Sequence, residues 1–304
     1  MSERTETLRE LCAAAAQHSR LVITGHDRAD VDSVASCVLM QRLLDSWHIL
    51  CGIVLIEPDK QSRRVMARFG VDVDALAGET KDGDQLILVD HHQSAHAGTV
   101  IACVDHHPTD YPPEYPYVQL EADGACAVMV LRLMQEAGIS VTPEEERLAI
   151  TALYLDTIAL KSAKITKEEA AWGEREAQRL GLDAEWLRRE GMGLRDMRLP
   201  ARELAMLGRK VYQFGERRVL STYVQTDALA KEKLDEILNV LREEIVREQA
   251  DLWVYLHHDP VRMRSTEYDL TPEGWVEVIA YDFLASRGKD VMPRVERAMR
   301  KGNA

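Results

Sequence analysis

Residues that can hold a metal ion gather in one short segment, residues 25–33, which contains His26, Asp30 and Asp32. One imidazole and two carboxylates close together in the chain offer nitrogen and oxygen ligands at the same point. Such a mixture suits Mn²⁺, Mg²⁺, Zn²⁺ or Fe²⁺. The segment overlaps the end of the apolar run at residues 21–25 and precedes a helical pattern. We therefore expect a metal-binding turn between a strand and a helix.

Further acidic and imidazole side chains follow other apolar runs. Two Asp/His clusters close such runs, namely Asp90-His91-His92 and Asp105-His106-His107. A further acid, Asp156, stands in the apolar helical pattern of residues 150–160. Because its neighbours are apolar, an unpaired charge there would be costly, so the sequence predicts a partner for Asp156.

Each cluster alone also has a plain structural interpretation, because Asp and His are common in turns and caps at strand ends. The combination is harder to explain in that way. Several carboxylates at one edge of a sheet would repel one another unless cations neutralised them. The pattern as a whole therefore favours a metal site.

The elements that must position these residues alternate between apolar runs and helical patterns. The apolar runs are residues 21–25, 51–56, 85–89 and 99–104, and the helical patterns are residues 4–18, 33–46 and 60–68. This alternation predicts an α/β fold with a doubly wound, mainly parallel sheet. In such sheets the ligand lies beyond the carboxyl ends of the strands, where the Asp and His clusters stand.

A second domain is predicted after residue 200. Helical patterns at residues 124–136 and 144–160 lead to a segment rich in Gly, Pro and charge at residues 191–200. Such a segment favours a domain boundary. Beyond it, a strand candidate at residues 217–224 and an amphipathic helix predict a smaller α+β domain. The helix carries Leu234, Ile237, Leu238, Leu241 and Ile245 on one face. We expect a metal-binding domain at residues 1–190 and a substrate-binding domain at residues 200–304.

Composition narrows the classes of partner. The chain of 304 residues has a formal net charge of −13 and a pI near 5.3, which argues against nucleic acid and anionic membranes. Five cysteines without a Cys-x-x-Cys pair are interpreted as buried thiols. No run approaches the roughly 18 apolar residues of a membrane span, and the N-terminus has no export signal, so we expect a cytoplasmic protein.

The motifs resemble, in order and spacing, those of DHH phosphoesterases, with the strongest likeness to manganese-dependent (family II) inorganic pyrophosphatases and exopolyphosphatases. Gly25-His-Asp-Arg-Ala-Asp-Val-Asp-Ser33 resembles their Gly-His-x-x-Pro-Asp-x-Asp-Ser, and Asp156-Thr-Ile-Ala-Leu-Lys161-Ser162 resembles their Asp-Thr-x-x-x-Lys-Ser. The likeness continues in Leu207-Gly-Arg-Lys210 and in Ser286-Arg287-Gly288-Lys289-Asp290, and so covers nearly the whole chain.

This resemblance implies a site for two Mn²⁺ ions, with Mg²⁺ or Co²⁺ as alternatives. One ion would be held by His26, Asp30 and Asp90. The other would be held by Asp32, Asp90, His106 and Asp156, with Asp90 bridging the two. Two such ions can share a water molecule and lower its pKa, which produces a nucleophile near neutral pH. The implied reaction is hydrolysis of pyrophosphate to two phosphates.

The resemblance also implies the residues that meet the substrate, a small phosphorylated anion. His107 is the candidate for phosphate contact or general acid catalysis. Lys210, Arg287 and Lys289 of the second domain would bind the phosphate oxygens, for which Arg offers a planar fork and Lys a point charge. A homodimer formed through a sheet edge is a further implication of the family likeness.

The sequence departs from the family pattern at four positions. His92 stands where the second motif commonly has Asn, and Gly208 stands where an Asp is usual. Gly288 replaces a lysine, and Asp290 replaces a glutamine. The loss of a cation and the gain of an anion beside the phosphate pocket predict a change in substrate choice or rate.

Three alternative functions stay open at this point. An exopolyphosphatase acting on short polyphosphates would use the same metal ligands. A nucleotide phosphodiesterase of the DHH type would carry a Gly-Gly-Gly-His-like loop, and the sequence has no such run. A non-catalytic phosphate-binding regulator would not need four converging carboxylates.

Overall fold

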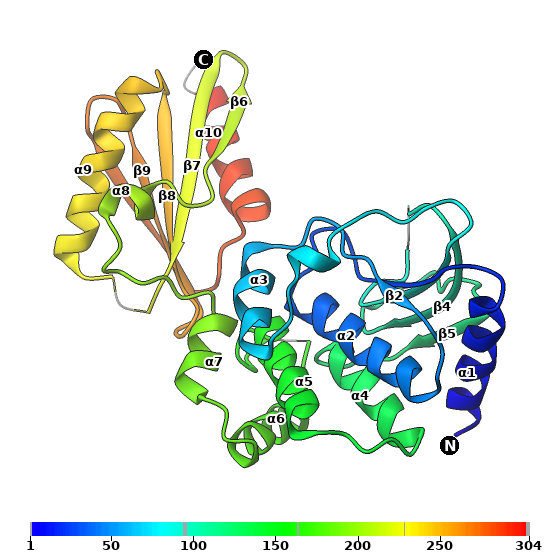
Figure 1. The fold of residues 1–304 in the computed structure, drawn as a ribbon. Helices are drawn as coiled ribbons and strands as arrows, with labels where there is room; N and C mark the ends of the chain where they lie inside the picture. Colours follow the sequence, from blue (N-terminus) through cyan, green and yellow to red (C-terminus); the bar gives the residue numbers. More distant parts are fainter. Residues whose placement is uncertain (1, 94–95, 163, 228, 302–304) are drawn as a thin grey trace. The chain divides into compact units, whose positions relative to one another are not determined.

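The computed structural model describes residues 2–93, 96–162, 164–227 and 229–301. The chain divides into two compact units, Met1–Gly191 and Met192–Ala304, and each has its own β-sheet (Figure 1). The division falls where the Gly- and Pro-rich segment at residues 191–200 begins.

The first unit is built on a five-stranded sheet. Its strands are β1 (Leu21–Thr24), β2 (Gly52–Ile53), β3 (Gln85–Val89), β4 (Thr99–Asp105) and β5 (Tyr117–Leu120). They lie in the order β2-β1-β3-β4-β5, and each neighbouring pair is parallel. The predicted α/β class with a mainly parallel sheet is therefore confirmed. Because β1, β3 and β4 are adjacent, the predicted metal-binding clusters meet at one edge.

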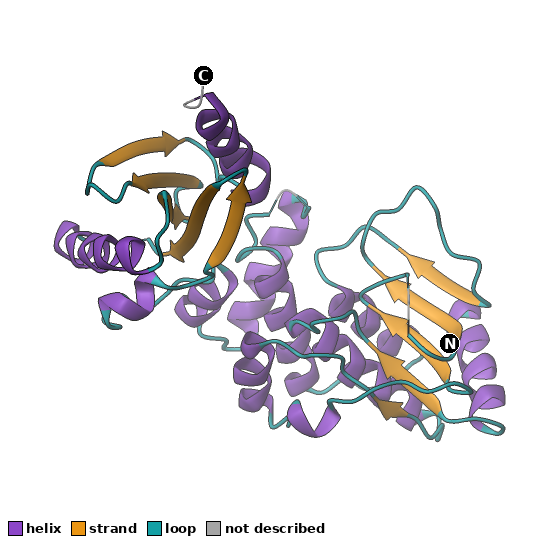
Figure 2. Ribbon diagram, turned by 90° about the horizontal axis from the view of Figure 1, so that it is seen from above, coloured by secondary structure: helices purple, strands orange, loops and turns teal. Residues whose placement is uncertain are grey.

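Seven α-helices accompany this sheet within the described residues (Figure 2). They are α1 (Glu3–Ala16), α2 (Val31–Ser46), α3 (Lys60–Met66), α4 (Cys126–Glu136), α5 (Pro143–Asp156), α6 (Lys167–Arg179) and α7 (Ala184–Gly191). Ile23, Ile87 and Val89 belong to the main apolar cluster, together with buried residues of α1, α2, α4 and α5. Alternate strand residues, such as Val22 and Leu88, form a smaller cluster without helical members among the described residues.

Two predicted elements end earlier than their patterns indicated. The strand expected at residues 51–56 is regular only in β2, with one isolated bridge from Leu55 to Ala77 beyond it. The helix expected at residues 144–160 ends at Asp156, because residues 158–160 have positive φ angles of 52°, 53° and 64°. Left-handed residues cannot continue a right-handed helix. Asp156 is thus the last residue of α5 rather than an interior one.

The second unit is a mixed sheet with helices on both faces. The strands are β6 (Lys210–Phe214), β7 (Arg217–Gln225), β8 (Leu252–Asp259), β9 (Arg264–Leu270) and β10 (Val276–Tyr281). They lie in the order β10-β9-β8-β7-β6; β7 and β8 run parallel, and the other neighbouring pairs run antiparallel. The helices are α8 (Ala201–Ala205), α9 (Lys231–Arg247) and α10 (Met292–Lys301), and a π-helical turn at Arg287–Val291 precedes α10.

The predicted amphipathic helix of the second unit is α9. Its buried residues Ile237, Leu241 and Ile245 pack in one cluster with Trp253 of β8, while Val295 of α10 belongs to the cluster on the opposite face. Alternation of side chains along the strands supplies both faces with apolar residues. No helix among the residues described in either unit is long and apolar enough to cross a membrane.

Candidate metal centre

The turn after β1 places His26 and Asp30 at the carboxyl end of the sheet. Gly25 makes the turn feasible, because a Cβ atom there would lie 2.7 Å from Ser33 Cβ. Asp30 is the N-cap of α2, where its Oδ1 accepts a hydrogen bond from the Ser33 N–H at 3.1 Å. Its other oxygen, Oδ2, lies 3.6 Å from His26 Nε2. A strand end and a helix cap together place an imidazole beside a carboxylate.

Asp90 lies between two histidines. It follows β3, has a φ angle of 63°, and is 2% exposed. Its Oδ2 accepts a 2.6 Å hydrogen bond from Ser33 Oγ and lies 3.4 Å from His26 Nε2. Its Oδ1 lies 3.2 Å from His106 Nε2. The two oxygens therefore face different histidines, an arrangement in which one carboxylate could contact two ions.

His106 also faces two further carboxylates. Its Nε2 atom lies 3.7 Å from Asp32 Oδ2 and 3.6 Å from Asp156 Oδ2. Asp32 is fully buried in the first turn of α2, and its carboxylate accepts hydrogen bonds from the backbone N–H groups of Cys126 (2.7 Å) and Ala127 (2.9 Å). The start of α4 thus fixes the direction of Asp32.

The proton positions on both histidines fit a metal site. His26 Nδ1 lies 2.7 Å from the Asp27 carbonyl oxygen, and His106 Nδ1 lies 2.9 Å from the Asp123 carbonyl oxygen. Because a carbonyl oxygen only accepts, each Nδ1 carries the proton and each Nε2 is directed at carboxylates. His106 Nε2 is buried and forms no well-aligned hydrogen bond. Metal-ligating histidines characteristically donate their second nitrogen in this way.

The turn after α5 delivers Asp156. Lys164 Nζ forms an ion pair with Asp156 Oδ2, so a lysine neutralises this carboxylate. Positive φ angles recur around the site, at Arg28 (61°), at Asp90 and at residues 158–160. Each such conformation in a non-glycine residue costs about 1–3 kcal/mol and characteristically persists at functional sites.

The six residues predicted as metal ligands come together in two groups. Ligand atoms of His26, Asp30 and Asp90 lie within 4.8 Å of one another. The same holds for ligand atoms of Asp32, His106 and Asp156. Asp90 connects the two groups through its contact with His106. The structure thus brings all six side chains together in a candidate metal-binding cluster.

The electrostatics reflect crowded negative charge. Burial, and then the charges of Asp90 and Asp156, raise the pKa of Asp32 well above its ordinary value. Burial opposes ionisation of Asp90 as well, but its contacts with His106, His26 and Ser33 outweigh burial and lower its pKa.

The same carboxylates act on the histidines. Asp30 and Asp90 raise the pKa of His26 to about 11. Burial lowers the pKa of His106, but Asp90 and Asp32 more than compensate and raise it to about 9. Without a metal the cluster therefore holds protons that an ion would displace.

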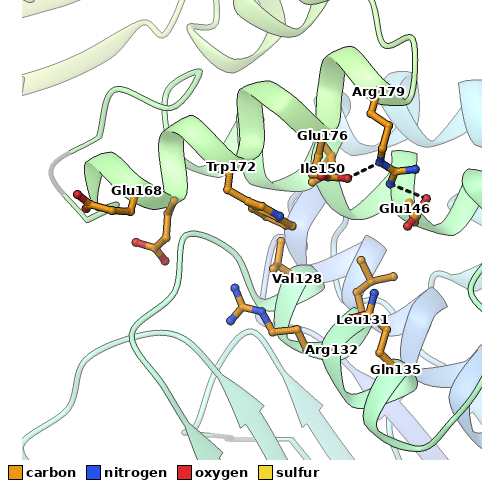
Figure 3. Close-up of a pocket in the computed structure, with 11 residues that line it drawn as sticks. Val128, Leu131, Arg132, Gln135, Glu146, Ile150, Glu168, Trp172, Glu176 and Arg179 are labelled. Carbon is orange, nitrogen blue, oxygen red and sulfur yellow. Dashed lines mark hydrogen bonds and ion pairs between the residues drawn. The ribbon is translucent and has the colours of Figure 1, made fainter.

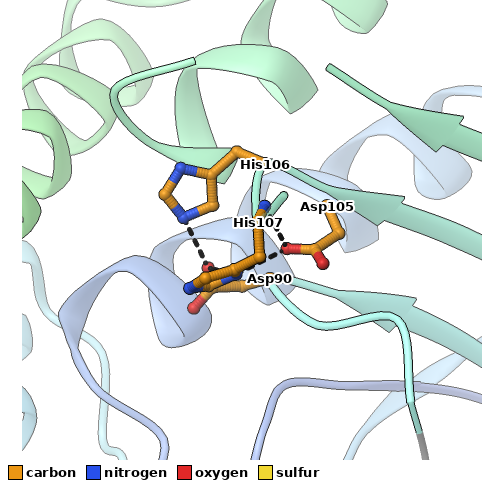
Figure 4. Close-up of side chains that lie close together, drawn as sticks. All are labelled: Asp90, Asp105, His106 and His107. Carbon is orange, nitrogen blue, oxygen red and sulfur yellow. Dashed lines mark hydrogen bonds and ion pairs between the residues drawn. The ribbon is translucent and has the colours of Figure 1, made fainter. Parts of the chain in front are cut away.

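His107 is not one of the six predicted ligands, but with Asp90, Asp105 and His106 it forms a further group whose ligand atoms lie within 4.8 Å of one another. Its Nδ1 atom lies 2.8 Å from Asp105 Oδ1 and 3.8 Å from Asp90 Oδ1, and its side chain is 47% exposed (Figure 4). The other oxygen of Asp105 lies 2.5 Å from His92 Nδ1. One buried carboxylate thus orients two imidazoles. One of these two imidazoles is His92, which stands where the family commonly has Asn.

A cavity of about 600 Å³ opens over this edge of the first unit. His26 and Asp90 line it together with His92, Asp105 and His107. Its volume falls in the range of sites for small-molecule ligands. An anion in this cavity would meet both the candidate metal ligands and the imidazole of His107.

Comparison with known proteins shows that residues 20–160 match the DHH family, N-terminal domain. This part of the chain is a DHH domain. The resemblance drawn from the motifs is thereby confirmed. A probable manganese-dependent inorganic pyrophosphatase of Deinococcus radiodurans is 28% identical over 160 residues, which cover 49% of this chain and 50% of that protein. The manganese-dependent inorganic pyrophosphatase of Methanocaldococcus jannaschii is 23% identical over 308 residues, which cover 91% and 98%.

A solved structure shares the fold over most of the chain. It is a Methanococcus jannaschii protein assigned as a family II inorganic pyrophosphatase, and its TM-score is 0.55 at 23% identity. The match covers 91% of this chain and 99% of that protein, so the likeness includes the second unit as well as the DHH domain.

Outside the DHH domain, Arg287 is the predicted phosphate-binding residue for which the structure gives side-chain contacts. Arg287 Nη1 donates to the Gly208 carbonyl oxygen at 2.5 Å, and its guanidinium lies 5.5 Å from the centre of the Tyr223 ring. Gly208 lies two residues before Lys210, the exposed first residue of β6. Arg287 is thereby tied to the segment that carries Lys210. Lys289 is exposed in the π-helical turn.

Two of the departures from the family pattern have a structural account. A Cβ atom at Gly208 would lie 2.2 Å from a carbon of the Tyr223 ring, and its φ angle is 58°, so the position requires glycine. Asp290 Oδ2 accepts a 2.6 Å hydrogen bond from the Ser286 N–H, so this carboxylate closes its own loop. Nothing in the structure explains Gly288, where a Cβ atom would meet no neighbour within 4 Å.

The sequence did not indicate which residues hold the predicted metal ligands and His107 in place. Ser33, Lys164 and Asp105 make side-chain contacts to predicted ligands or to His107. Asp123 contributes only its carbonyl oxygen to His106, which no sequence signal could reveal. Asp105 belongs to the Asp105-His106-His107 motif, so its place in the sequence was a signal for it.

Proposed function

We propose that the chain is a manganese-dependent inorganic pyrophosphatase that hydrolyses pyrophosphate to two phosphates. One observation carries the proposal: the two oxygens of Asp90 face His26 and His106 separately. The substrate and the metal come from the names of the relatives. The chain is a hydrolase acting on phosphoanhydrides, and the proposal specifies which anhydride it cleaves.

The proposed metal ligands divide into two sets that share Asp90. One set is His26, Asp30 and Asp90, and the other is Asp32, Asp90, His106 and Asp156. Nitrogen and carboxylate donors in this number suit Mn²⁺. Bound ions would supply an activated water molecule and positive charge for phosphate oxygens. Both histidines present Nε2 to the cluster, which supports their assignment as ligands.

His107 is proposed to contact the phosphate and to donate a proton to the leaving phosphate. Its Nδ1 is directed at Asp105, which leaves Nε2 as the nitrogen available to the substrate. Lys210, Arg287 and Lys289 are proposed to bind the phosphate oxygens. The tie between Arg287 and the Gly208 carbonyl supports a joint role for Arg287 and Lys210.

The test is phosphate release by protein that has been stripped of metal and then supplied with Mn²⁺. Pyrophosphate, tripolyphosphate and a linear dinucleotide are compared, with Asp90→Ala as the inactive control. We expect rapid release from pyrophosphate and a loss of more than about 100-fold in the variant, because both ions would lose a ligand.

The other outcomes are informative as well. Preference for tripolyphosphate would assign the protein as an exopolyphosphatase, and cleavage of the dinucleotide alone would make it a phosphodiesterase. Bound Mn²⁺ without release from any of the three would overturn the proposal in favour of a binding role.

A further inference from the structure

The beginning of α4 and the residues before it hold two proposed ligands of the same ion. The N–H groups of Cys126 and Ala127 bond the carboxylate of Asp32 at 2.7 and 2.9 Å. The carbonyl oxygen of Asp123 accepts from His106 Nδ1 at 2.9 Å. The direction of His106 Nε2 therefore depends on where the loop before α4 holds the Asp123 carbonyl.

Asp123 is itself held by its side chain. It is 6% exposed, and its Oδ1 accepts a 2.8 Å hydrogen bond from the Gly124 N–H. Its Oδ2 forms an ion pair with Arg132 Nη1, from the second turn of α4. A buried carboxylate with one charged partner depends strongly on that partner. Arg132 is thus the cation that pairs with the buried Asp123 carboxylate.

Arg132 is reachable from outside the metal cluster. With Val128 and Trp172 it lines a cavity of about 550 Å³ in the first unit (Figure 3). The chain of contacts runs from this cavity through Arg132 and the buried Asp123 to His106. None of these contacts requires Arg132 to approach the substrate.

We propose that Arg132 is a positioning residue for His106 and acts through Asp123; this rests on the proposed function, in which His106 binds Mn²⁺. Loss of the arginine leaves the Asp123 carboxylate buried without its cation. The carboxylate then turns toward water, and the carbonyl that orients His106 moves with it. Replacing a group that orients a metal-ligating histidine typically weakens metal binding about 10- to 100-fold.

The same cavity offers a matched control. Arg179 also lines it, and its ion pairs are with Glu146 and Glu176. Neither glutamate is a proposed ligand. A variant of Arg179 removes a guanidinium from the same cavity wall without entering the contacts that lead to His106.

The experiment titrates Mn²⁺ into metal-stripped full-length protein by calorimetry, with unfolding temperatures recorded for each metal-free variant. Arg132→Met is expected to weaken one of two Mn²⁺ sites about 10- to 100-fold and to leave the other within about 2-fold. Arg132→Lys, which keeps the charge, is expected to restore part of the affinity. Arg179→Met is expected to bind Mn²⁺ like the wild type.

Two results would overturn this inference alone. One is wild-type affinity at both sites in Arg132→Met. The other is an equal weakening of both sites together with a lower unfolding temperature, which would indicate general destabilisation. A wild-type protein that binds no Mn²⁺ would overturn the proposed function and this inference with it.

Discussion

Nδ1 of His107 lies 2.8 Å from Oδ1 of the buried Asp105, and this contact fixes the direction in which the exposed imidazole faces the cavity. Burial opposes ionisation of Asp105, but His107 and His92 outweigh it and lower its pKa. Asp105 is therefore an ionised acceptor at neutral pH. It accepts a hydrogen bond from His107 Nδ1, so donation of a proton from Nε2 to the leaving phosphate requires the doubly protonated imidazolium form of His107.

Replacing this acceptor tests the role of His107. Asp105→Asn keeps the volume but offers His107 an amide in place of a carboxylate. We expect kcat for pyrophosphate to fall about 10- to 100-fold, with Mn²⁺ stoichiometry unchanged, because proton transfer depends on the orientation of the imidazole. Asp110→Asn, an exposed residue of the same cavity, is the control. Undiminished kcat in Asp105→Asn would remove His107 from the proton-transfer step.

Metal binding is predicted to release protons. The pKa values of His26 and His106 are raised to about 11 and about 9 in the metal-free protein, so both are protonated at pH 7. An ion at Nε2 must displace these protons, so Mn²⁺ affinity should rise with pH up to about 11, and less steeply above about 9, where only His26 still holds its proton. The expected slope is up to about tenfold per pH unit for each proton released. Calorimetric titration in two buffers of different ionisation enthalpy counts the protons, and a pH-independent affinity would contradict the assignment.

Lys164 is predicted to compete with the metal for Asp156. Its ammonium group pairs with Asp156 Oδ2, at partial exposure of both side chains. Lys164→Met removes this internal cation, and we expect Mn²⁺ to bind about 2- to 5-fold more tightly, the scale of a partly exposed ion pair. Lys167→Met serves as the control, because Lys167 is exposed at the start of α6. Weaker binding in Lys164→Met would show instead that Lys164 supports the metal-loaded form.

The second unit contains a pH-sensitive carboxylate. Asp269 and Glu267 are buried on β9, share Arg294 as their cation, and Glu267 also accepts from the Tyr281 hydroxyl. Burial, and then the charge of Glu267, raise the pKa of Asp269 from 3.8 to about 7. The folded state therefore binds more protons than the unfolded state between these two values.

The raised pKa of Asp269 determines how the free energy of unfolding changes with pH. The contribution of Asp269 is fully present below about pH 4 and is lost as pH rises through about 7. We expect the difference in free energy of unfolding between wild type and Asp269→Asn to fall across this window, measured from urea midpoints at several pH values. A difference that stays constant or rises with pH would contradict the raised pKa.

The sequence by itself determined the class of the fold and pointed to the residues that the structure brings together as candidate metal ligands. Apolar runs that alternate with helical patterns predicted a parallel sheet. Asp90 and His106 stand at the ends of two of those runs. Because parallel strands end at one edge, spacing alone was enough to bring these side chains to one place. The positions of β1, β3 and β4 confirm that reasoning.

Only the tertiary structure decided what holds and orients the cluster. The predicted ligands are held by groups from other segments of the chain, namely the Asp123 carbonyl, the Cys126 N–H and the ammonium of Lys164. No periodicity in the sequence indicates these contacts. Backbone groups carry no side-chain signal, and ion pairs between loops depend on how the elements pack. The early end of α5 at Asp156 has the same origin, because the left-handed residues after it are selected by hydrogen bonds to Tyr154 and Thr157 rather than by their own preferences.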